Sequence, residues 1–227
     1  MDPKQAAAER ALQEVEDGMF LGLGTGSTAS YFVSSLGQRV SEGLNITAVA
    51  TSKATADLAT SLGIRLVTSA DRPLDLTVDG ADEIDPNLNL IKGLGGALLR
   101  EKLVAAASLR MTVIAGADKL VPQLGMRAPL PVEVLSLLWE RTGAQLEELD
   151  LRPELRKVPS SGAAFVSDNG NLILDCAFTP PRDLDELTLG LDRLPGVLGH
   201  GLFLGIATQA IIGEEDGSTR VITPAGD

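Results

Sequence analysis

The sequence predicts an α/β fold, with a Rossmann-like, mostly parallel sheet and a smaller α+β lid domain of ferredoxin-like type. In the first half of the chain, short apolar segments alternate with amphipathic helical ones, which is typical of parallel strands joined by crossover helices. Two prolines within 127–131 then mark a change of texture. Beyond them we expect a helix, a hairpin, a second helix and a strand, as in a split βαβ module.

The helices and strands of the first half are predicted from the spacing of the apolar residues in each segment. Segment 4–16 places Ala8, Ala11 and Val15 on one helical face. The helix expected at 53–62 ends before Gly63, a residue typical of helix C-termini. In chain order, helices are expected at 4–16, 29–40, 53–62 and 97–109, and strands at 19–23, 46–50, 64–67, 74–78 and 111–115.

The second half is expected to form the smaller domain. Its hairpin is centred on Asn169-Gly170, because Asn-Gly between apolar runs is the strongest short-range hairpin signal. Its second helix begins after Asp183, a good N-cap residue. Helices are expected at 134–141 and 183–194, and strands at 163–166, 172–177 and 201–204, with 206–212 and 220–222 returning to the first sheet. The predicted domains are therefore 1–128 with 205–227, and 129–204.

Composition excludes several classes of protein. The 31 acidic and 19 basic residues give a net charge of −12, which disfavours nucleic acid and anionic membranes as partners. No apolar run approaches the roughly 18 residues that span a bilayer, and 1–17 lacks the apolar block of a signal peptide. The single cysteine, Cys176, is expected to be buried and inert, and the single histidine, His200, to be structural. A cytoplasmic protein is predicted.

The first candidate site is the loop 24–28 (GTGST), between a predicted strand and a predicted helix. Its glycines let the backbone approach an anion, the helix start supplies N–H groups, and its hydroxyls add donors. The loop lacks the Gly-Lys pair of a P-loop. A dinucleotide site also needs an acidic residue at the end of the second strand, where this sequence has Ala-Thr-Ser at 50–52. We interpret it as a phosphate site without a nicotinamide cofactor. An ordinary glycine turn with a serine N-cap is the alternative.

The second candidate site directly follows the strand expected at 74–78. Four carboxylates fall there in seven residues: Asp79, Asp82, Glu83 and Asp85. Ligands bind at the carboxyl ends of strands in open α/β sheets. Crowded carboxylates there are suited to proton transfer. A calcium-like loop and a solvated acidic turn are the alternatives, although the spacing does not match an EF-hand.

The third candidate site joins a lysine to a glutamate through a glycine-rich loop. Lys92 precedes the loop, and Glu101 lies about one turn inside an otherwise mostly apolar helix. Desolvation in such surroundings suits a general base, while a solvated cluster with Arg100 and Lys102 is the alternative. A second lysine, Lys119, follows the strand at 111–115, where it can reach a phosphate as a point charge, and a solvent-facing lysine is the alternative.

Together these segments resemble type A ribose-5-phosphate isomerase over residues 22–204. DGADEID followed by KGxGGAxxREK is highly specific, whereas the glycine loop alone is not. One departure is Leu94, where the family usually has another glycine. The matching segments are GLGTGSTA, TSKATADLA, DGADEID, IKGLGGALLREK, VIAGADK, LPVEV, SDNGNLILD and LPGVLGHGLF, in the expected order.

The resemblance implies an aldose–ketose isomerase of the pentose phosphate pathway, which interconverts D-ribose 5-phosphate and D-ribulose 5-phosphate through an enediolate, without metal or cofactor. Glu101 would move the proton between C2 and C1, and Lys92 would stabilise the enediolate. The family's aspartates would correspond to Asp79, which is implicated in ring opening, and to Asp82. Homodimers or homotetramers are common in the family. The implied substrate-binding residues are Lys4, Thr25, Gly26, Ser27, Thr28, Gly80, Ala81, Gly93, Leu94, Gly95 and Lys119.

Two other classes of protein stay open. A non-catalytic sugar-phosphate sensor on a similar fold would keep the loop 25–28 without needing Glu101, but it would carry a DNA-binding segment, and no basic helix-turn-helix is visible in the sequence. A coenzyme A transferase also uses a glutamate on a related fold. It would bind a far larger substrate, for which 227 residues are few.

Overall fold

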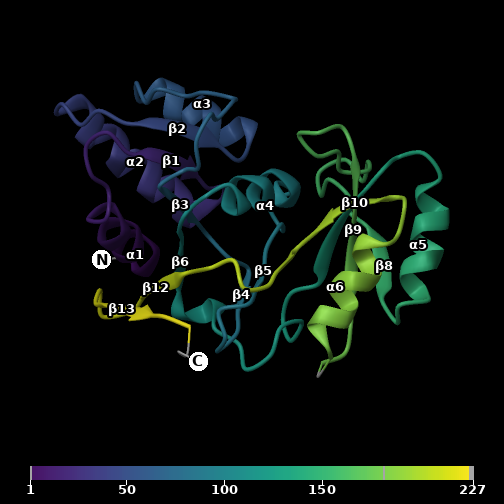
Figure 1. The fold of residues 1–227 in the computed structure, drawn as a ribbon. Coiled ribbons are helices and arrows are strands. Elements are labelled where there is room, and N and C mark those ends of the chain that lie inside the picture. Colours follow the sequence, from purple (N-terminus) through teal and green to yellow (C-terminus); the bar gives the residue numbers. More distant parts are fainter. Residues whose placement is uncertain (1, 181, 225–227) are drawn as a thin grey trace. The chain divides into compact units, whose positions relative to one another are not determined.

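A computed structural model of the protein describes residues 2–180 and 182–224 (Figure 1). The chain divides into two compact units. The first contains the described residues of 1–81, 100–120 and 205–227, and the second contains those of 82–99 and 121–204. The chain therefore leaves the first unit twice and returns to it twice. These units do not test the predicted domains 1–128 with 205–227 and 129–204, which stay a prediction.

The first unit is built on a six-stranded sheet in the order β13-β12-β6-β3-β1-β2 (Figure 1). Every neighbouring pair is parallel except β12 and β13, which are antiparallel. The return of the C-terminal segments to this sheet confirms that prediction. The strands are β1 (Phe20–Leu23), β2 (Thr47–Ala50), β3 (Leu76–Asp79), β6 (Met111–Gly116), β12 (Gln209–Gly213) and β13 (Thr219–Ile222).

Helices cover both faces of this sheet. Side chains alternate between the faces of a strand, so β1 shows which helix lies on which side. Leu21 and Leu23 are buried with residues of α1, α2 and α3, whereas Phe20 is buried in a separate cluster with Val104 of α4. A Cβ on Gly22 would lie 2.6 Å from the Val104 side chain, so the glycine lets α4 pack directly on β1. The helices are α1 (Pro3–Leu12), α2 (Ser27–Ser41), α3 (Lys53–Ser61) and α4 (Leu98–Ala106).

The second unit contains two antiparallel sheets, one of four strands in the order β10-β7-β9-β8 and one of three in the order β11-β5-β4. Helix α6 begins after Asp183, whose side chain caps it by accepting from the N–H of Glu186. The elements are β4 (Glu83–Ile84), β5 (Leu90–Ile91), β7 (Leu130–Val134), α5 (Trp139–Glu147), β8 (Arg152–Leu155), β9 (Leu172–Ala177), α6 (Leu184–Asp192), β10 (Val197–His200) and β11 (Leu202–Phe203).

The cysteine and the histidine belong to the interior of the second unit. Burial raises the pKa of the Cys176 thiol to about 12, so it stays protonated, as expected of an inert thiol. His200 is also buried. Its Nδ1 accepts from the N–H of Leu202 at 3.3 Å, and its Nε2 lies 3.2 Å from Asp192 Oδ1. These two contacts lie within its own unit, and its structural role stays a prediction. No described helix is both long and apolar enough to cross a bilayer.

Three predicted elements are wrong. The strand predicted at 163–166 forms only isolated bridges, between Ala164 and Lys157 and between Val166 and Leu172. Residues 64–67 form only an isolated bridge, between Leu66 and Ala48. The helix predicted at 134–141 begins instead at Trp139, because residues 130–134 are a fully buried central strand, β7, and Leu138 has a left-handed backbone with φ of 59°. Pro131 had indicated a connection, yet it pairs with Asp175 inside the sheet. Strands β4, β5, β8 and β10 were not predicted.

Candidate active site

In the first unit, the carboxyl ends of β1 and β3 meet through Asp79. This side chain is fully buried, and its Oδ1 accepts from the N–H of Thr25 at 3.0 Å and of Gly80 at 2.7 Å. Gly24 is in contact with it, since a Cβ there would lie 2.1 Å from Asp79 Oδ1. The carboxylate therefore orders the start of both loops. Ala81 follows in the same strand-end loop and is half-buried.

The hydroxyl of Thr25 belongs to a hydroxyl cluster made with Thr51, Ser52 and Thr55. Thr25 Oγ1 lies 2.7 Å from Thr51 Oγ1, 2.9 Å from Ser52 Oγ and 3.2 Å from Thr55 Oγ1. Thr55 Oγ1 in turn donates to the carbonyl of Gly24 at 2.9 Å. The cluster ties the glycine loop to the start of α3. Residues 51, 52 and 55 were not predicted as site residues, although TSKAT was visible at the end of the second strand.

The start of α2 presents main-chain N–H groups without a side-chain cap. Its N-cap is Gly26, with φ of 107°, and no side chain caps the helix. The alternative of a serine N-cap is therefore wrong, because Ser27 is already inside the first turn. Ser27 is exposed and Thr28 half-buried, and Lys4 Nζ donates to Ser27 Oγ at 3.1 Å. The first turn thus combines N–H groups, hydroxyls and a cation, which suits an anion.

Lys119 lies at the same edge of the sheet as Lys4. It ends the short 3₁₀-helix η1 (Ala117–Lys119), which directly follows the carboxyl end of β6. A Cβ on Gly213, the last residue of β12, would lie 1.8 Å from the carbonyl oxygen of Pro3, so the start of α1 packs against that edge. Lys4 and Lys119 are both half-buried. The sheet therefore brings both cations to its carboxyl edge.

Glu101 lies in the first turn of α4 and is only 4% exposed. The helix runs towards the amino ends of the strands, since the Ala107 carbonyl beyond its last residue accepts from the N–H of Leu74, just before β3. Its first turn is therefore directed towards the carboxyl ends. The expected desolvation of Glu101 agrees with this burial, and the alternative of a solvated charge cluster does not.

In the second unit, Lys92 is a buried cation at the end of β5. It is 2% exposed, and its Nζ lies 5.5 Å from the centre of the Phe203 ring. Its main-chain N–H donates to the carbonyl of Gly201 at 2.9 Å. A Cβ on Gly201 would lie 2.2 Å from the Lys92 carbonyl oxygen, so this approach requires glycine. Burial on an aromatic face limits the hydration of the ammonium.

The glycine loop after Lys92 is held by Asp82. The N–H of Leu94 donates to Asp82 Oδ2 at 2.9 Å, while the Leu94 side chain is 42% exposed. Gly93 and Gly96 have φ of 103° and 84°, which favours glycine, and Leu94 is not among the described residues with positive φ. Leucine therefore fits the position where the family usually has glycine. Gly95 is exposed.

The other two carboxylates of the acidic motif are structural. Glu83 is buried and accepts from the N–H groups of Gly125, Arg127 and Ala128 at 2.6 to 2.8 Å. Asp85 accepts from the N–H groups of Asn87 and Asn89, both at 2.8 Å. The solvated-turn alternative is thus wrong for Asp85, which is 8% exposed. Among the described residues, no group of three His, Cys, Asp or Glu is arranged to hold a metal ion.

Comparisons with known proteins agree on one family. The model of ribose 5-phosphate isomerase A (phosphoriboisomerase A) matches residues 47–217. The chain is 50% identical over 225 residues to ribose-5-phosphate isomerase A of Roseiflexus sp. (strain RS-1), covering 98% of this chain and 96% of that protein. It is 51% identical over 224 residues to the protein of that name from Gloeobacter violaceus (strain ATCC 29082 / PCC 7421), with coverage of 98% and 96%.

Solved structures agree with this match. A D-ribose-5-phosphate isomerase in complex with phospho-erythronic acid superposes with a TM-score of 0.93 at 35% identity, over 98% of this chain and 100% of that one. Ribose 5-phosphate isomerase from Plasmodium falciparum gives 0.91 at 36% identity, over 97% of each chain. The predicted α/β fold class is confirmed.

Proposed function

The chain belongs to the ribose 5-phosphate isomerase A family, and we propose how its own residues carry out the reaction of that family. The reaction is the aldose–ketose interconversion of D-ribose 5-phosphate and D-ribulose 5-phosphate. A hydrogen moves from C2 to C1, the C1 aldehyde becomes a hydroxyl, and the C2 hydroxyl becomes a ketone. The protein must therefore supply a base, a group that stabilises the enediolate and a hold on the phosphate.

Glu101 is the proposed base. Its carboxylate takes the proton from C2 of the open-chain aldose and returns it to C1. The observation that carries this assignment is that Glu101 is 4% exposed and lies in the first turn of α4, the end of the helix nearer the carboxyl ends of the strands, where α/β folds bind ligands. A carboxylate with few water contacts is a better proton acceptor than an exposed one.

Lys92 is the proposed electrostatic partner of the enediolate. Removal of the C2 proton places negative charge on the oxygens of C1 and C2, and a fixed cation lowers the energy of that state. The burial of the ammonium against the Phe203 ring supports this role, because a cation held in place needs little rearrangement of water when the negative charge develops.

The two aspartates have different proposed roles. Asp79 assists ring opening by moving a proton between the C1 hydroxyl and the ring oxygen, and the loop N–H groups on its Oδ1 hold its orientation. Asp82 holds the Leu94 peptide and thereby the loop after Lys92. Main-chain groups of Gly80, Ala81, Gly93, Leu94 and Gly95 are proposed to contact the sugar.

The phosphate is proposed to bind at the first turn of α2, with the N–H groups after Gly26, the hydroxyls of Ser27 and Thr28, and the cations Lys4 and Lys119. The uncapped helix start and the contact between Lys4 and Ser27 support this site. Thr25 has a positioning role in this proposal, since its hydroxyl lies in the cluster with Thr51, Ser52 and Thr55.

We further propose that the reaction needs no metal, because base and cation are both side chains of the chain, and that the enzyme is a cytoplasmic homodimer or homotetramer. The test is to treat the protein exhaustively with EDTA, add ribose 5-phosphate and follow the formation of ribulose 5-phosphate. Full activity is expected. Activity that is lost and then restored by magnesium or zinc would overturn metal independence, and no activity under any condition would overturn the function.

A further inference from the structure

Arg156, which directly follows β8, joins a strand of the second unit to the glycine loop after Lys92. Its Nε and Nη2 form a bidentate salt bridge with the two carboxylate oxygens of Asp175 on β9. Its Nη1 donates to the carbonyls of Gly93 and Leu94, both at 2.9 Å. The Arg156 side chain is only 10% exposed. One guanidinium thus connects a fixed carboxylate to two successive carbonyls of the loop.

The same arginine is packed against the far end of the loop through Phe165. The guanidinium carbon lies 5.7 Å from the centre of the Phe165 ring, and the N–H of Phe165 donates to the Arg156 carbonyl at 2.8 Å. A Cβ on Gly96 would lie 2.5 Å from Phe165 Cζ, so ring and loop are in contact. Arg156 and Phe165 together support the loop from Gly93 to Gly96.

The Gly93–Leu94 peptide is held from opposite sides. The C=O and N–H of a trans peptide point in opposite directions. The Gly93 carbonyl accepts from Arg156, and the Leu94 N–H of the same peptide donates to Asp82. Gly93 has no Cβ to resist rotation of this peptide. A flip would turn the carbonyl towards the Asp82 carboxylate and the N–H towards the guanidinium, so both contacts would become repulsive.

We propose that Arg156 is a positioning residue, which keeps the Gly93–Leu94 peptide oriented with its N–H on Asp82 and so fixes the loop that follows Lys92. Its effect on catalysis rests on the proposed function, but its effect on the loop does not. Arginine is required at this position because its planar fork supplies donors to Asp175 and to both carbonyls at once, whereas a lysine ammonium cannot match that geometry.

The test compares Arg156→Met and Arg156→Lys with Arg152→Met, a matched control in which an exposed arginine of β8 is replaced. Two quantities are measured: the hydrogen-exchange rate of the Leu94 amide by NMR, and kcat and KM for ribose 5-phosphate. Exchange is expected to be roughly 10–100-fold faster in both Arg156 variants, as for the loss of charge-assisted hydrogen bonds. Because small misplacements of reacting groups are costly, kcat should fall roughly 10–100-fold while KM changes little. The control should match the wild type in both.

Several outcomes would overturn the proposal. Wild-type exchange and kcat in folded Arg156→Met would do so, and full activity in Arg156→Lys would show that charge without the fork suffices. If Arg156→Met does not fold, Asp175→Asn keeps the arginine but weakens its anchor, and it should produce smaller changes of the same kind. A wild type without isomerase activity would remove the proposed function only, since Leu94 exchange tests the positioning by itself.

Discussion

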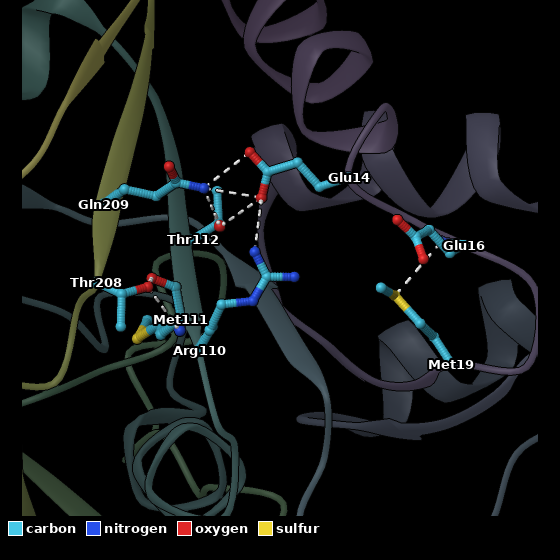
Figure 2. A network of polar contacts seen from close by, with 8 residues as sticks. All are labelled: Glu14, Glu16, Met19, Arg110, Met111, Thr112, Thr208 and Gln209. Atoms are coloured by element: carbon cyan, nitrogen blue, oxygen red, sulfur yellow. Dashed lines mark hydrogen bonds and ion pairs between the residues drawn. The ribbon is translucent and has the colours of Figure 1, made fainter.

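The two ends of the parallel sheet in the first unit differ in how their polar side chains are used. At the amino ends of β6 and β12, polar side chains form hydrogen bonds and an ion pair with one another (Figure 2). Gln209 Nε2 lies 2.8 Å from both carboxylate oxygens of Glu14 and from Thr112 Oγ1. Arg110 Nη1 lies 3.9 Å from Glu14 Oε2. This network joins the segment after α1 to two neighbouring strands.

At the carboxyl ends, polar side chains instead hold loops and helix starts. Asp79 accepts from the N–H groups of two loops, and Ser27 stands in an uncapped first turn beside Lys4. Polarity alone therefore does not mark a site. A network of side chains that hydrogen-bond to one another stabilises the fold. Side chains that hydrogen-bond to loops at the carboxyl ends of the strands instead order the region where α/β folds bind ligands. Substitutions at the two ends should accordingly affect different measurable quantities.

The largest effect is expected for Glu101→Gln. Glutamine keeps the size and the hydrogen-bonding capacity of glutamate but cannot take a proton. The loss of a general base should lower kcat by roughly 10²–10⁴-fold, with KM little changed. In heavy water the wild type should incorporate deuterium at C1 or C2 of the sugar, and the variant should do so far more slowly. Glu147→Gln, on the exposed face of α5, is the matched control. Normal turnover in Glu101→Gln would place the base elsewhere, with Asp82 as the next candidate.

A smaller effect is expected for Lys119→Ala. Loss of a charge-assisted contact to phosphate should weaken binding by about 1.5–3 kcal/mol. The affinity for ribose 5-phosphate should therefore fall, while that for unphosphorylated ribose should not. Lys157→Ala, an exposed lysine of the second unit, is the control. An equal loss for both sugars would count against a phosphate role for Lys119 and would weaken the distinction between the two ends of the sheet.

At the amino ends, Glu14→Leu should change stability and not turnover. Thr112 is fully buried, and the substitution removes an acceptor of Thr112 and of Gln209, which keeps its contact with Thr112 Oγ1. The free energy of unfolding in urea should fall by about 1–3 kcal/mol, with kcat and KM unchanged. Glu16→Leu, two residues on and exposed, should change it by less than about 0.5 kcal/mol. A loss of kcat in folded Glu14→Leu would show that the amino ends also serve the reaction.

Local patterns were sufficient to predict much of the first unit. The loop 24–28, the helices after β1 and β2, and the alternation of strands and helices along the chain follow from the apolar period and the glycine positions, which depend on neighbours in the chain. Strand β7 was missed for the opposite reason. Its assignment depends on pairing with β9, some 40 positions later, as Pro131↔Asp175 and Val132↔Leu174 show.

The candidate site shows the same limit. Glu83 looked like one carboxylate among four, but its partners are main-chain N–H groups beyond residue 124, which no local pattern indicates. Arg156 had no distinguishing neighbour in sequence. Its partners, Asp175 on another strand and the carbonyls of Gly93 and Leu94, are brought together only by the fold. Candidate site residues with local signals could be proposed from the sequence, whereas residues that act through distant contacts could not.

The smallest expected effect concerns Asp75, at the amino end of β3. Asp75 Oδ2 accepts from the N–H of Phe20 at the start of β1 at 2.7 Å, and both carboxylate oxygens lie 3.0 Å from Arg72 Nη1. The hydrogen bond from Arg72, and then that from Phe20, lower the pKa of Asp75 below its ordinary value. The folded state therefore releases this proton more readily than the unfolded state does.

The sign of the pH dependence follows from that direction. Because the folded pKa is the lower one, the stabilisation is fully present above the unfolded pKa of about 3.9 and is lost as the pH falls through the folded pKa. The asparagine of Asp75→Asn does not titrate in this range. The free energy of unfolding of the wild type should therefore exceed that of the variant by less than about 1 kcal/mol near pH 7, and this difference should shrink below about pH 4. Urea unfolding of both proteins from pH 7 to pH 3 measures this, with Asp216→Asn, an exposed aspartate in the β12–β13 turn, as a comparison outside the amino-end contacts. A difference that grows on acidification would mean that the pKa of Asp75 is raised in the folded state, and it would contradict this prediction.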